Sequence, residues 1–473
     1  MYGWSKGDVS YLIIFTTYPN KTTTYLLAIE KEKTLIYTEK RFKRVYKRRG
    51  KNMWNRNFLM VVIGQIISLF GNAILRFALP LYLLNETGSA ALFGMVSACA
   101  FIPMIVLSPI GGIFADRVNK RNIMVVLDFA TAILVLMIML LLGKMNLVVL
   151  LFGAMFILYG VQGAYQPAVQ ASIPALLSEE HIMQGNAVIN LISSFSGLIG
   201  PVIGGALFGF YGIMPILYVS AVCFLLSAIM EIFIHIPFEK KQTQGNIFAI
   251  GFGDLKESFH YISKEQPLII KLSLAVAAIN MILSALIIIG LPVIVTQMLA
   301  FESEAANRLY GYAEGVMAIG SLCGGMGAGV FAGKMRTRNG YMLLFYDALT
   351  LIPIGISLLL PMPAMVAYIV ILVSCFVMMF LANLFSIQLM AYLQMIVPAD
   401  LIGKVISCAM CIGMCVSPIG QAIYGGLFEG MRSCIYHVFF AAAVLTVALA
   451  FGLKKAFVEL EKIVDGSIQK HEK

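Results

Sequence analysis

The stretch that decides the fold is Gly111-Gly112-Ile113-Phe114-Ala115-Asp116-Arg117-Val118-Asn119-Lys120-Arg121, which lies between two long apolar runs. Charged side chains are costly in hydrocarbon, so this turn must lie outside the membrane core. Three of its four charges are basic, which places the turn on the cytoplasmic side. Asp116 follows Gly112 by one helical turn, so a neighbouring helix end can approach the carboxylate where the glycine has no side chain.

The composition of the chain is that of an integral membrane protein. Of its 473 residues, 60% are hydrophobic and 12% are charged, whereas a soluble domain has about 45–50% apolar and about 25% charged residues. The apolar runs are continuous and exceed the ~20 residues that cross a bilayer as a helix, which favours helices over a barrel. We therefore expect a chain embedded in the lipid bilayer.

The net charge of +10 comes mainly from an N-terminal extension. Residues 1–52 hold 12 Lys or Arg against 4 Asp or Glu, and the rest of the chain holds 22 against 20. Such a basic segment can bind nucleic acid or anionic lipid. We favour a segment that is not native or that keeps the N-terminus in the cytoplasm, with no nucleic-acid partner and with Met53 as the functional start.

Turn signals between the apolar runs predict twelve membrane helices. An even number places both termini on one side, and the basic residues near the N-terminus, at 117–121, at 334–338 and at 454–455 make that side cytoplasmic. We expect the acidic stretch 178–181 to be a cytoplasmic loop. The helices are predicted at 57–84, 91–114, 123–142, 147–170, 188–212, 214–236, 268–298, 307–333, 340–359, 363–391, 404–428 and 433–452.

One long polar interruption divides the predicted helices into two groups of six. Its apolar residues recur at helical spacing between Phe252 and Ile262, which predicts an amphipathic helix on the membrane surface. A shift of 217 residues aligns Pro201 with Pro418 and the 117–121 turn with a second basic turn. The predicted units are a 1–52 extension, a 53–236 half, a 237–267 linker, a 268–452 half and a charged helical tail at 453–473.

The charged stretch resembles the loop between the second and third helices of the major facilitator superfamily, G-x-x-x-D-R-x-G-R-R. Asn119 departs from it by replacing the usual glycine. The resemblance implies an all-α integral membrane protein, with twelve transmembrane helices in two pseudo-symmetric six-helix halves. The matching residues are Gly112, Asp116, Arg117, Lys120 and Arg121.

A second motif lies in the fifth predicted helix. A proline inside a helix removes a backbone hydrogen bond and bends the helix, and paired glycines allow another helix to pack closely. From this physical chemistry alone, the motif indicates only an ordinary kink in the helix. It resembles G-P-x-x-G-G, a signature of exporters in the superfamily, although Ser196 replaces an upstream glycine of the full pattern. The residues of this motif are Gly200, Pro201, Gly204 and Gly205.

Parts of the first helix resemble the branch of the superfamily that contains macrolide-efflux proteins and the enterobactin exporter, notably Gly64-Gln65, Gly71-Asn72 and Thr87-Gly88-Ser89-Ala90. The resemblance implies a monomer in the bacterial inner membrane that exports hydrophobic small molecules in exchange for protons, by alternating access and without a cofactor. The alternatives are a siderophore-type exporter or an importer of the same fold.

In the superfamily, helices 1, 4, 7 and 10 line the substrate cavity. Polar side chains are expensive in lipid, so the polar stripes on these helices are expected to face a wet interior. The alternative is that they form hydrogen bonds between helices. The candidates for substrate contact are Gln65, Asn72, Arg76, Tyr159, Gln162, Gln166, Asn280, Ser284 and Asn383.

Proton coupling requires a group whose charge changes as access alternates. The candidates are Glu314 and Asp128. For Glu314 we expect Arg76 to lie nearby and to compete with a proton for its carboxylate. Asp128 and Asp347 also lie close to basic loops and are interpreted as partners of those cations. Glu231 lies near a predicted helix end, where it is expected to reach water.

An intramembrane enzyme is the remote alternative. Gly251-Phe252-Gly253-Asp254 and Tyr346-Asp347 match the two motifs of intramembrane aspartyl proteases, but they occur in the wrong order and one lies in the polar linker. The sequence has no P-loop and no His-Glu-x-x-His zinc motif, which argues against ATP hydrolysis and metalloprotease chemistry. We predict no metal site, because cysteines at helical spacing in apolar runs are more typical of packing.

Overall fold

The computed structural model describes residues 2–5, 10–18, 21–29, 53–236, 267–331, 337–397 and 402–471. Twelve of its helices are long and apolar enough to cross a membrane, which confirms the all-α, twelve-helix prediction for the membrane part. The N-terminal extension adds a small antiparallel sheet that the sequence analysis did not predict. Its strands pair in the order β1 (Tyr2–Ser5), β2 (Ser10–Tyr18) and β3 (Lys21–Ile29).

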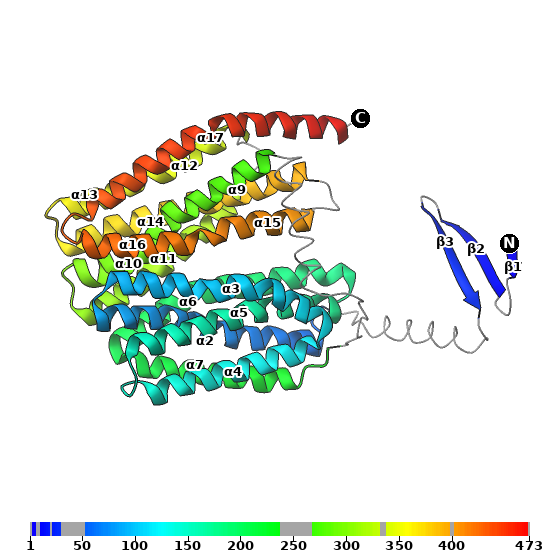
Figure 1. Cartoon of the computed structure of the whole chain (residues 1–473), viewed down its shortest axis with the longest axis horizontal. Coiled ribbons are helices and arrows are strands. Elements are labelled where there is room, and N and C mark those ends of the chain that lie inside the picture. Colours follow the sequence, from blue (N-terminus) through cyan, green and yellow to red (C-terminus); the bar gives the residue numbers. More distant parts are fainter. Residues whose placement is uncertain are drawn as a thin grey trace.

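The N-terminal half of the bundle, α2–α7, consists of six helices that each cross as one continuous element. Figure 1 shows them lying side by side in the lower layer of the molecule. Most of their N-termini are capped, as in Asn55, whose side chain accepts a hydrogen bond from the backbone N–H of Phe58 at 3.0 Å. The helices are α2 (Arg56–Thr87), α3 (Ala90–Arg117), α4 (Lys120–Leu141), α5 (Leu147–Leu176), α6 (Glu179–Tyr211) and α7 (Ile213–Ile232).

The C-terminal half, α9–α17, is built from more interrupted segments. Its first span contains two π-helical segments, η2 (Asn280–Ser284) and η3 (Ile294–Met298), on either side of α10 (Ala285–Val293). Its third and fifth spans are each divided in two. The remaining elements are α9 (Pro267–Ile279), α11 (Ser303–Phe331), η4 (Thr337–Asn339), α12 (Gly340–Leu349), α13 (Leu351–Leu359), α14 (Ala364–Ile396), α15 (Ile402–Cys415), α16 (Ser417–Gly430) and α17 (Tyr436–His471).

The start of α6 differs from the prediction for a clear physical reason. The stretch 178–181, predicted as a loop, contains the first turn of α6, which begins at Glu179. Acidic side chains are favourable in the first turn of a helix, because they face its positive end. At the other end of the chain α17 runs unbroken to His471, so the tail is helical as predicted. The predicted amphipathic helix at 252–262 lies outside the described residues.

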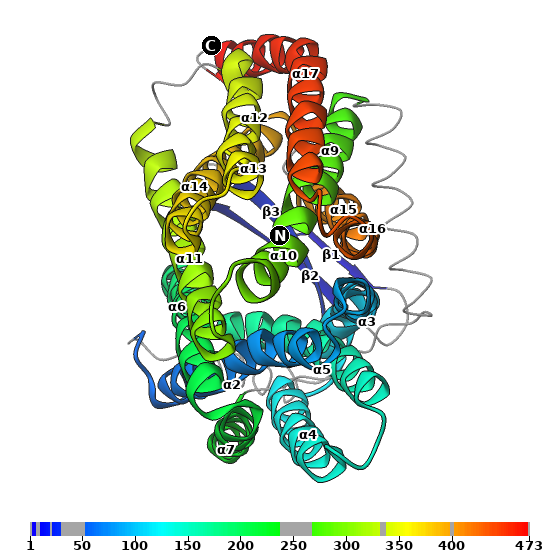
Figure 2. The same cartoon turned by 90° about the vertical axis from the view of Figure 1, so that its left-hand side faces the viewer.

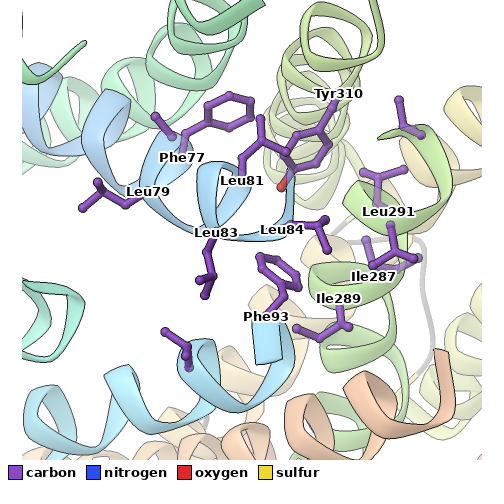
Figure 3. Packing of buried hydrophobic residues seen from close by; sticks show 14 of the residues in the cluster. Phe77, Leu79, Leu81, Leu83, Leu84, Phe93, Ile287, Ile289, Leu291 and Tyr310 are labelled. Atoms are coloured by element: carbon purple, nitrogen blue, oxygen red, sulfur yellow. The ribbon is translucent and has the colours of Figure 1, made fainter. Parts of the chain in front are cut away.

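Buried apolar side chains form three clusters, and their location shows where the halves meet. We call the end of the bundle that carries the 111–121 stretch the inner end, and the end that carries Gly88 and Gly212 the outer end. The largest cluster lies towards the outer end and joins both halves. Figure 3 shows Phe77, Leu84 and Phe93 of the N-terminal half facing Leu291 and Tyr310 of the C-terminal half.

The other two clusters lie towards the inner end, and each belongs to one half. One gathers around Phe58 and Ile173, and the other around Leu272 and Phe457. Figure 2 looks along the bundle and shows α2–α7 on one side and α9–α17 on the other. Apolar packing therefore joins the halves at the outer end, whereas each half keeps its own core at the inner end.

Candidate functional site

The outer end is closed by two helix crossings, of which the first joins α6 to α11. A Cβ atom on Gly205 would lie 2.7 Å from the Cα of Gly311 and 3.0 Å from the carbonyl oxygen of Asn307. A Cβ on Gly311 would meet the carbonyl oxygen of Pro201 at 2.6 Å. Only glycines permit backbones to approach this closely, so the motif predicted in the fifth helix forms a direct contact between the halves.

The same motif also fixes α6 against α2 within the N-terminal half. A Cβ on Gly200 would clash with the side chain of Ala73, and one on Gly204 would lie 3.1 Å from the ring of Phe77. The ring of Phe77 stacks on Tyr310 of α11, with ring centroids 4.9 Å apart. The predicted exporter motif is thus the point where α2, α6 and α11 meet.

The second crossing joins α3 to α16. A Cβ on Gly94 would lie 2.6 Å from the carbonyl oxygen of Gln421 and 2.8 Å from the Cα of Gly425. Polar contacts reinforce it at the outer rim, where Arg432 donates to the carbonyl oxygen of Gly88 at 2.8 Å. Asn85 also donates to the side-chain oxygen of Asn307 at 2.8 Å, which links α2 to α11.

The inner end has a different character. A Cβ on Gly112, in the charged stretch, would meet nothing within 4 Å, and the same is true of Gly329, its counterpart in the repeat. The side chain of Asp116 lies outside the described residues, so its predicted contact with a helix end stays a prediction. Within the described part of the chain the halves are joined mainly at the outer end.

The polar stripe on α2 divides into two groups. Towards the outer end, Arg76 donates a hydrogen bond to the side-chain oxygen of Gln162 on α5. The guanidinium of Arg76 also lies over the ring of Tyr159, 4.1 Å from its centroid. These predicted substrate-contacting residues therefore meet where α2 and α5 face each other, and Arg76 and Gln162 keep part of their surface exposed.

The second group is buried inside the N-terminal half. Gln65 of α2 donates to the hydroxyl of Tyr165 on α5 at 2.6 Å, and that hydroxyl donates to Glu231 on α7 at 2.8 Å. Ser68 of α2 donates to Asp128 on α4 at 3.0 Å. Gln65 and Glu231 are 0% exposed and Asp128 is 2% exposed, so four helices bury two carboxyl groups together.

A small cavity of about 10 Å³ adjoins this cluster, which is close to the smallest volume that can hold a water molecule. The predicted substrate residues Asn72, Gln162 and Gln166 line it together with Asp128 and Tyr165. The cavity thus lies between the buried carboxyl group of Asp128 and the group around Arg76.

Two interpretations of these acids from the sequence are wrong. Glu231 was expected to reach water at a helix end, but Gly64 of α2 leaves room for it, and its Cγ lies within 3.6 Å of where a Cβ on Gly64 would stand. Asp128 was expected to pair with basic loops, but in the described structure its Oδ1 accepts a hydrogen bond from the hydroxyl of Ser68, and its Oδ2 is buried without a partner. Both carboxyl groups face the interior of the half because α7 packs closely on α2 and α4.

Glu314 lies on α11, in the C-terminal half. It accepts a hydrogen bond from the hydroxyl of Tyr310 at 3.0 Å. Arg76 contacts Gln162 and Tyr159 instead of Glu314. The expected competition between Arg76 and a proton for Glu314 is therefore not supported by a contact in this state. Glu314 therefore has only a neutral hydroxyl partner among the described residues.

Two of the three candidates in the C-terminal half, Asn280 and Asn383, form hydrogen bonds between helices. Asn280, in the π-helical η2, donates to the carbonyl oxygen of Gly413 on α15 at 3.0 Å, and Ser284 donates to Asn280 at 3.1 Å. Asn383 on α14 donates to the carbonyl oxygen and the hydroxyl of Ser321 on α11. Here Asn280 and Asn383 make the contacts between helices that the alternative interpretation anticipated.

A further buried acid, Asp347 on α12, is 1% exposed, and neither of its carboxyl oxygens has a hydrogen-bond partner. The Gly251–Asp254 motif lies outside the described residues. Within the described ranges no three His, Cys, Asp or Glu side chains gather in a way that could hold a metal ion.

The sequence profile of the Major Facilitator Superfamily matches residues 61–421. The chain belongs to this superfamily and is a multi-pass membrane transporter rather than an enzyme. This identification agrees with the twelve spans, the two halves and the glycine-mediated crossings described above.

Individual relatives narrow the comparison. The chain is 24% identical to macrolide efflux protein A of Streptococcus pyogenes over 419 residues, which cover 84% of this chain and 95% of that protein. It is 28% identical to the multidrug resistance protein MdtG of Salmonella paratyphi C over 198 residues, covering 40% of this chain and 48% of that protein. The sequence is thus similar to transporters named for efflux of macrolides and of several drugs.

Solved structures agree on the fold. The nucleoside transporter NupG superimposes with a TM-score of 0.67 at 14% identity, covering 85% of this chain and 99% of that chain. A bacterial homologue of the human lysosomal transporter Spinster, in an inward-facing conformation, superimposes with a TM-score of 0.59 at 15% identity, covering 88% and 96%. At this level of identity the likeness concerns the fold alone.

Proposed function

We propose that the protein exports hydrophobic small molecules such as macrolides across a bacterial inner membrane in exchange for protons. The observation that carries this proposal is the placement of Gly200, Pro201, Gly204 and Gly205, the motif that resembles an exporter signature, at the junction of α2, α6 and α11. A rigid junction at the outer end can hold that end closed until substrate is bound from inside.

The transport cycle that we propose is a rocking of the two halves about a substrate site between them. In the described state the outer end is closed, so the cytoplasm is the side from which substrate would enter. The basic 111–121 stretch, with Asp116, Arg117, Lys120 and Arg121, would then close the inner end in the opposite state. Both termini are cytoplasmic in this scheme, following the excess of basic residues on that side.

The substrate class rests on the relatives and on the chemistry of the chain. Macrolide efflux protein A matches along most of its length. The chain contains 28 Met and 31 Phe residues, and flexible, polarizable side chains suit surfaces that accept varied apolar ligands. We propose that Arg76, Tyr159 and Gln162 supply the polar contacts of the site, because they meet on facing helices and because Arg76 and Gln162 remain partly exposed.

The test is drug accumulation in a pump-deficient bacterium that expresses the full chain. We expect lower accumulation of a labelled macrolide and a higher inhibitory concentration, with both effects removed by a protonophore. Pro201→Leu should impair export by straightening α6 at the junction, whereas Gly197→Leu should not, because a Cβ at position 197 would meet nothing within 4 Å. Accumulation that rises on expression would indicate an importer, and export that survives the protonophore would contradict proton coupling.

A further inference from the structure

We propose that Asp128 and Glu231 form a proton-exchange site inside the N-terminal half, with Tyr165 as the hydroxyl that links it to the substrate pathway. The ligand is the proton itself, taken up from the outer side and released to the inner side. This inference rests on the proposed function, because it names the group that would carry the driving ion.

The site is assembled by four helices rather than by one acidic stretch. Glu231 comes from α7, Asp128 from α4, Tyr165 from α5, and Gln65 and Ser68 from α2. The hydroxyl of Ser227, one turn before Glu231, donates to the carbonyl oxygen of Gly64 at 3.1 Å. Every hydrogen bond in the cluster thus joins two different helices. A change in the protonation of the carboxyl groups therefore affects how the helices of the N-terminal half pack.

In the described part of the chain, no Lys, Arg or His is a hydrogen-bond partner of either carboxyl group. Among the helices packed against α7, α4 brings Asp128 to the cluster and carries Lys120 and Arg121 in its first turn. Tyr165 reaches Glu231 from α5. The charged side chains of α2 contact neither carboxyl group, and the acidic and histidine residues of α6 lie in its first turn. Two carboxylates buried together without a cation repel each other, so the cluster is stable only when it holds a proton.

Three buried oxygens in the cluster have no partner, and they provide places for that proton. They are Oδ2 of Asp128, Oε2 of Glu231 and Oε1 of Gln65. When Glu231 is ionised, Tyr165 donates to it, as observed at 2.8 Å. When Glu231 takes up a proton, it becomes a donor itself, and the free oxygen of Gln65 is an acceptor in the same cluster.

The cavity supplies the route from this site to the substrate pathway. Asp128 and Tyr165 line it together with Asn72 and Gln162. Oδ1 of Asn72 is also buried without a partner, and Gln162 holds Arg76. A change of proton occupancy at the carboxyl groups can therefore affect Arg76 through the polar side chains that line the cavity. No ion has to cross apolar packing for this.

The experiment is infrared difference spectroscopy of the purified full chain, titrated in H₂O and in D₂O. In the wild type we expect a carboxylic acid C=O band that disappears as carboxylate bands grow, and that shifts in D₂O. Glu231→Gln and Asp128→Asn should each change this titration, and the double variant should abolish it. Asp347→Asn is the matched control, because it removes an equally buried acid from the other half and should leave the band of the pair unchanged.

Transport separates this inference from the proposed function. In proteoliposomes, Glu231→Gln should lose uphill macrolide accumulation driven by a pH gradient but retain substrate–substrate exchange, and Glu231→Asp should recover part of the accumulation. Tyr165→Phe, which keeps both acids, should shift the midpoint of the infrared titration. An absence of macrolide transport in the wild type with the titrating band present would contradict the proposed function alone. Unchanged titration in the double variant would overturn the proton site, whatever is transported.

Discussion

The two halves of the transporter share a repeat but use their polar side chains differently. In the N-terminal half the larger polar side chains bond to one another, as in the series Gln65, Tyr165 and Glu231. In the C-terminal half they bond to backbone carbonyls, as Asn280 does to Gly413 and Tyr424 to Ile282. Asp347, close to the position that the repeat relates to Asp128, is buried without any partner.

The backbone differs in the same way. Each span of α2–α7 is one continuous helix, whereas the described C-terminal half has two π-helical segments and two divided spans. Breaks in a helix free backbone groups and allow bending, and π-helical turns often mark functional positions. We infer that the N-terminal half holds the ion in a fixed frame, and that bending during transport is concentrated in the C-terminal half.

The largest expected effect comes from the crossing that joins the halves. Gly205→Leu and Gly311→Leu should both open the outer end, because each side chain would enter the same contact between α6 and α11. Overpacking of about 1–3 kcal/mol would shift the balance between closed and open states by roughly 5–150-fold. Distances between spin labels on the outer ends of α6 and α11 would measure the shift.

Gly197→Leu is the matched control for this prediction, since it lies on the same helix and faces open space. Equal effects at positions 205 and 311 would show that the crossing belongs to both halves. An unchanged distance distribution in both variants would contradict the account of outer closure.

The next effect concerns one buried acid from each half, Asp347 and Asp128. Asp347→Leu should stabilise the protein by about 1–2 kcal/mol, because both carboxyl oxygens lack partners and their burial is uncompensated. Asp128→Leu should instead destabilise it, since the buried hydroxyl of Ser68 would lose its acceptor. Thermal unfolding in detergent would measure both, and a destabilised Asp347→Leu variant would show that this acid has a role that the structure does not reveal.

Much of the fold could be predicted from the sequence, because long apolar runs leave few alternatives to membrane helices. The glycine and proline motif was also placed on the correct helix. The divided spans were missed although Pro353 and Pro418 signal them, since each lies near the start of a new segment, α13 and α16. A proline cannot donate to the preceding turn, so a break just before it was predictable.

The candidate site was harder to predict, and Glu231 shows why. Its position near the end of an apolar run suggested contact with water, whereas its burial depends on Gly64 of another helix. Ser227 and Glu231, one turn apart on α7, form a polar stripe that was the available signal. Arg76 was correctly placed near the substrate candidates, but its partners on α5 depend on how α2 and α5 pack.

A smaller effect should come from the link between the π-helical segment and α15. Asn280→Ala removes the hydrogen bond to the carbonyl oxygen of Gly413, which is worth about 1 kcal/mol. We expect faster hydrogen exchange in α15 with little change in α2–α7. Ser284→Ala is the control, because its hydroxyl bonds to Asn280 and its removal leaves the hydrogen bond from Asn280 to Gly413 in place. Equal acceleration of hydrogen exchange in both halves would contradict the separation of roles.

The smallest effect is expected for removal of the extension. A chain that starts at Met53 retains Asn55, which caps α2 and donates to the carbonyl oxygen of Leu176 at 3.0 Å. Its melting temperature and transport should equal those of the full chain. Asn55→Ala in the shortened chain should cost about 1 kcal/mol, and loss of stable membrane insertion on truncation alone would show that residues 1–52 contribute to folding.

The central claim is that export is driven by protons that exchange at the N-terminal half, and proton flux in proteoliposomes tests it most directly. With a pH-sensitive dye trapped inside, a macrolide moving down its own gradient should drive protons in the opposite direction through the wild type. Glu231→Gln should permit macrolide exchange without proton movement, and Asp347→Asn should behave as the wild type does. Macrolide movement without proton flux, or with protons moving in the same direction, would contradict the account.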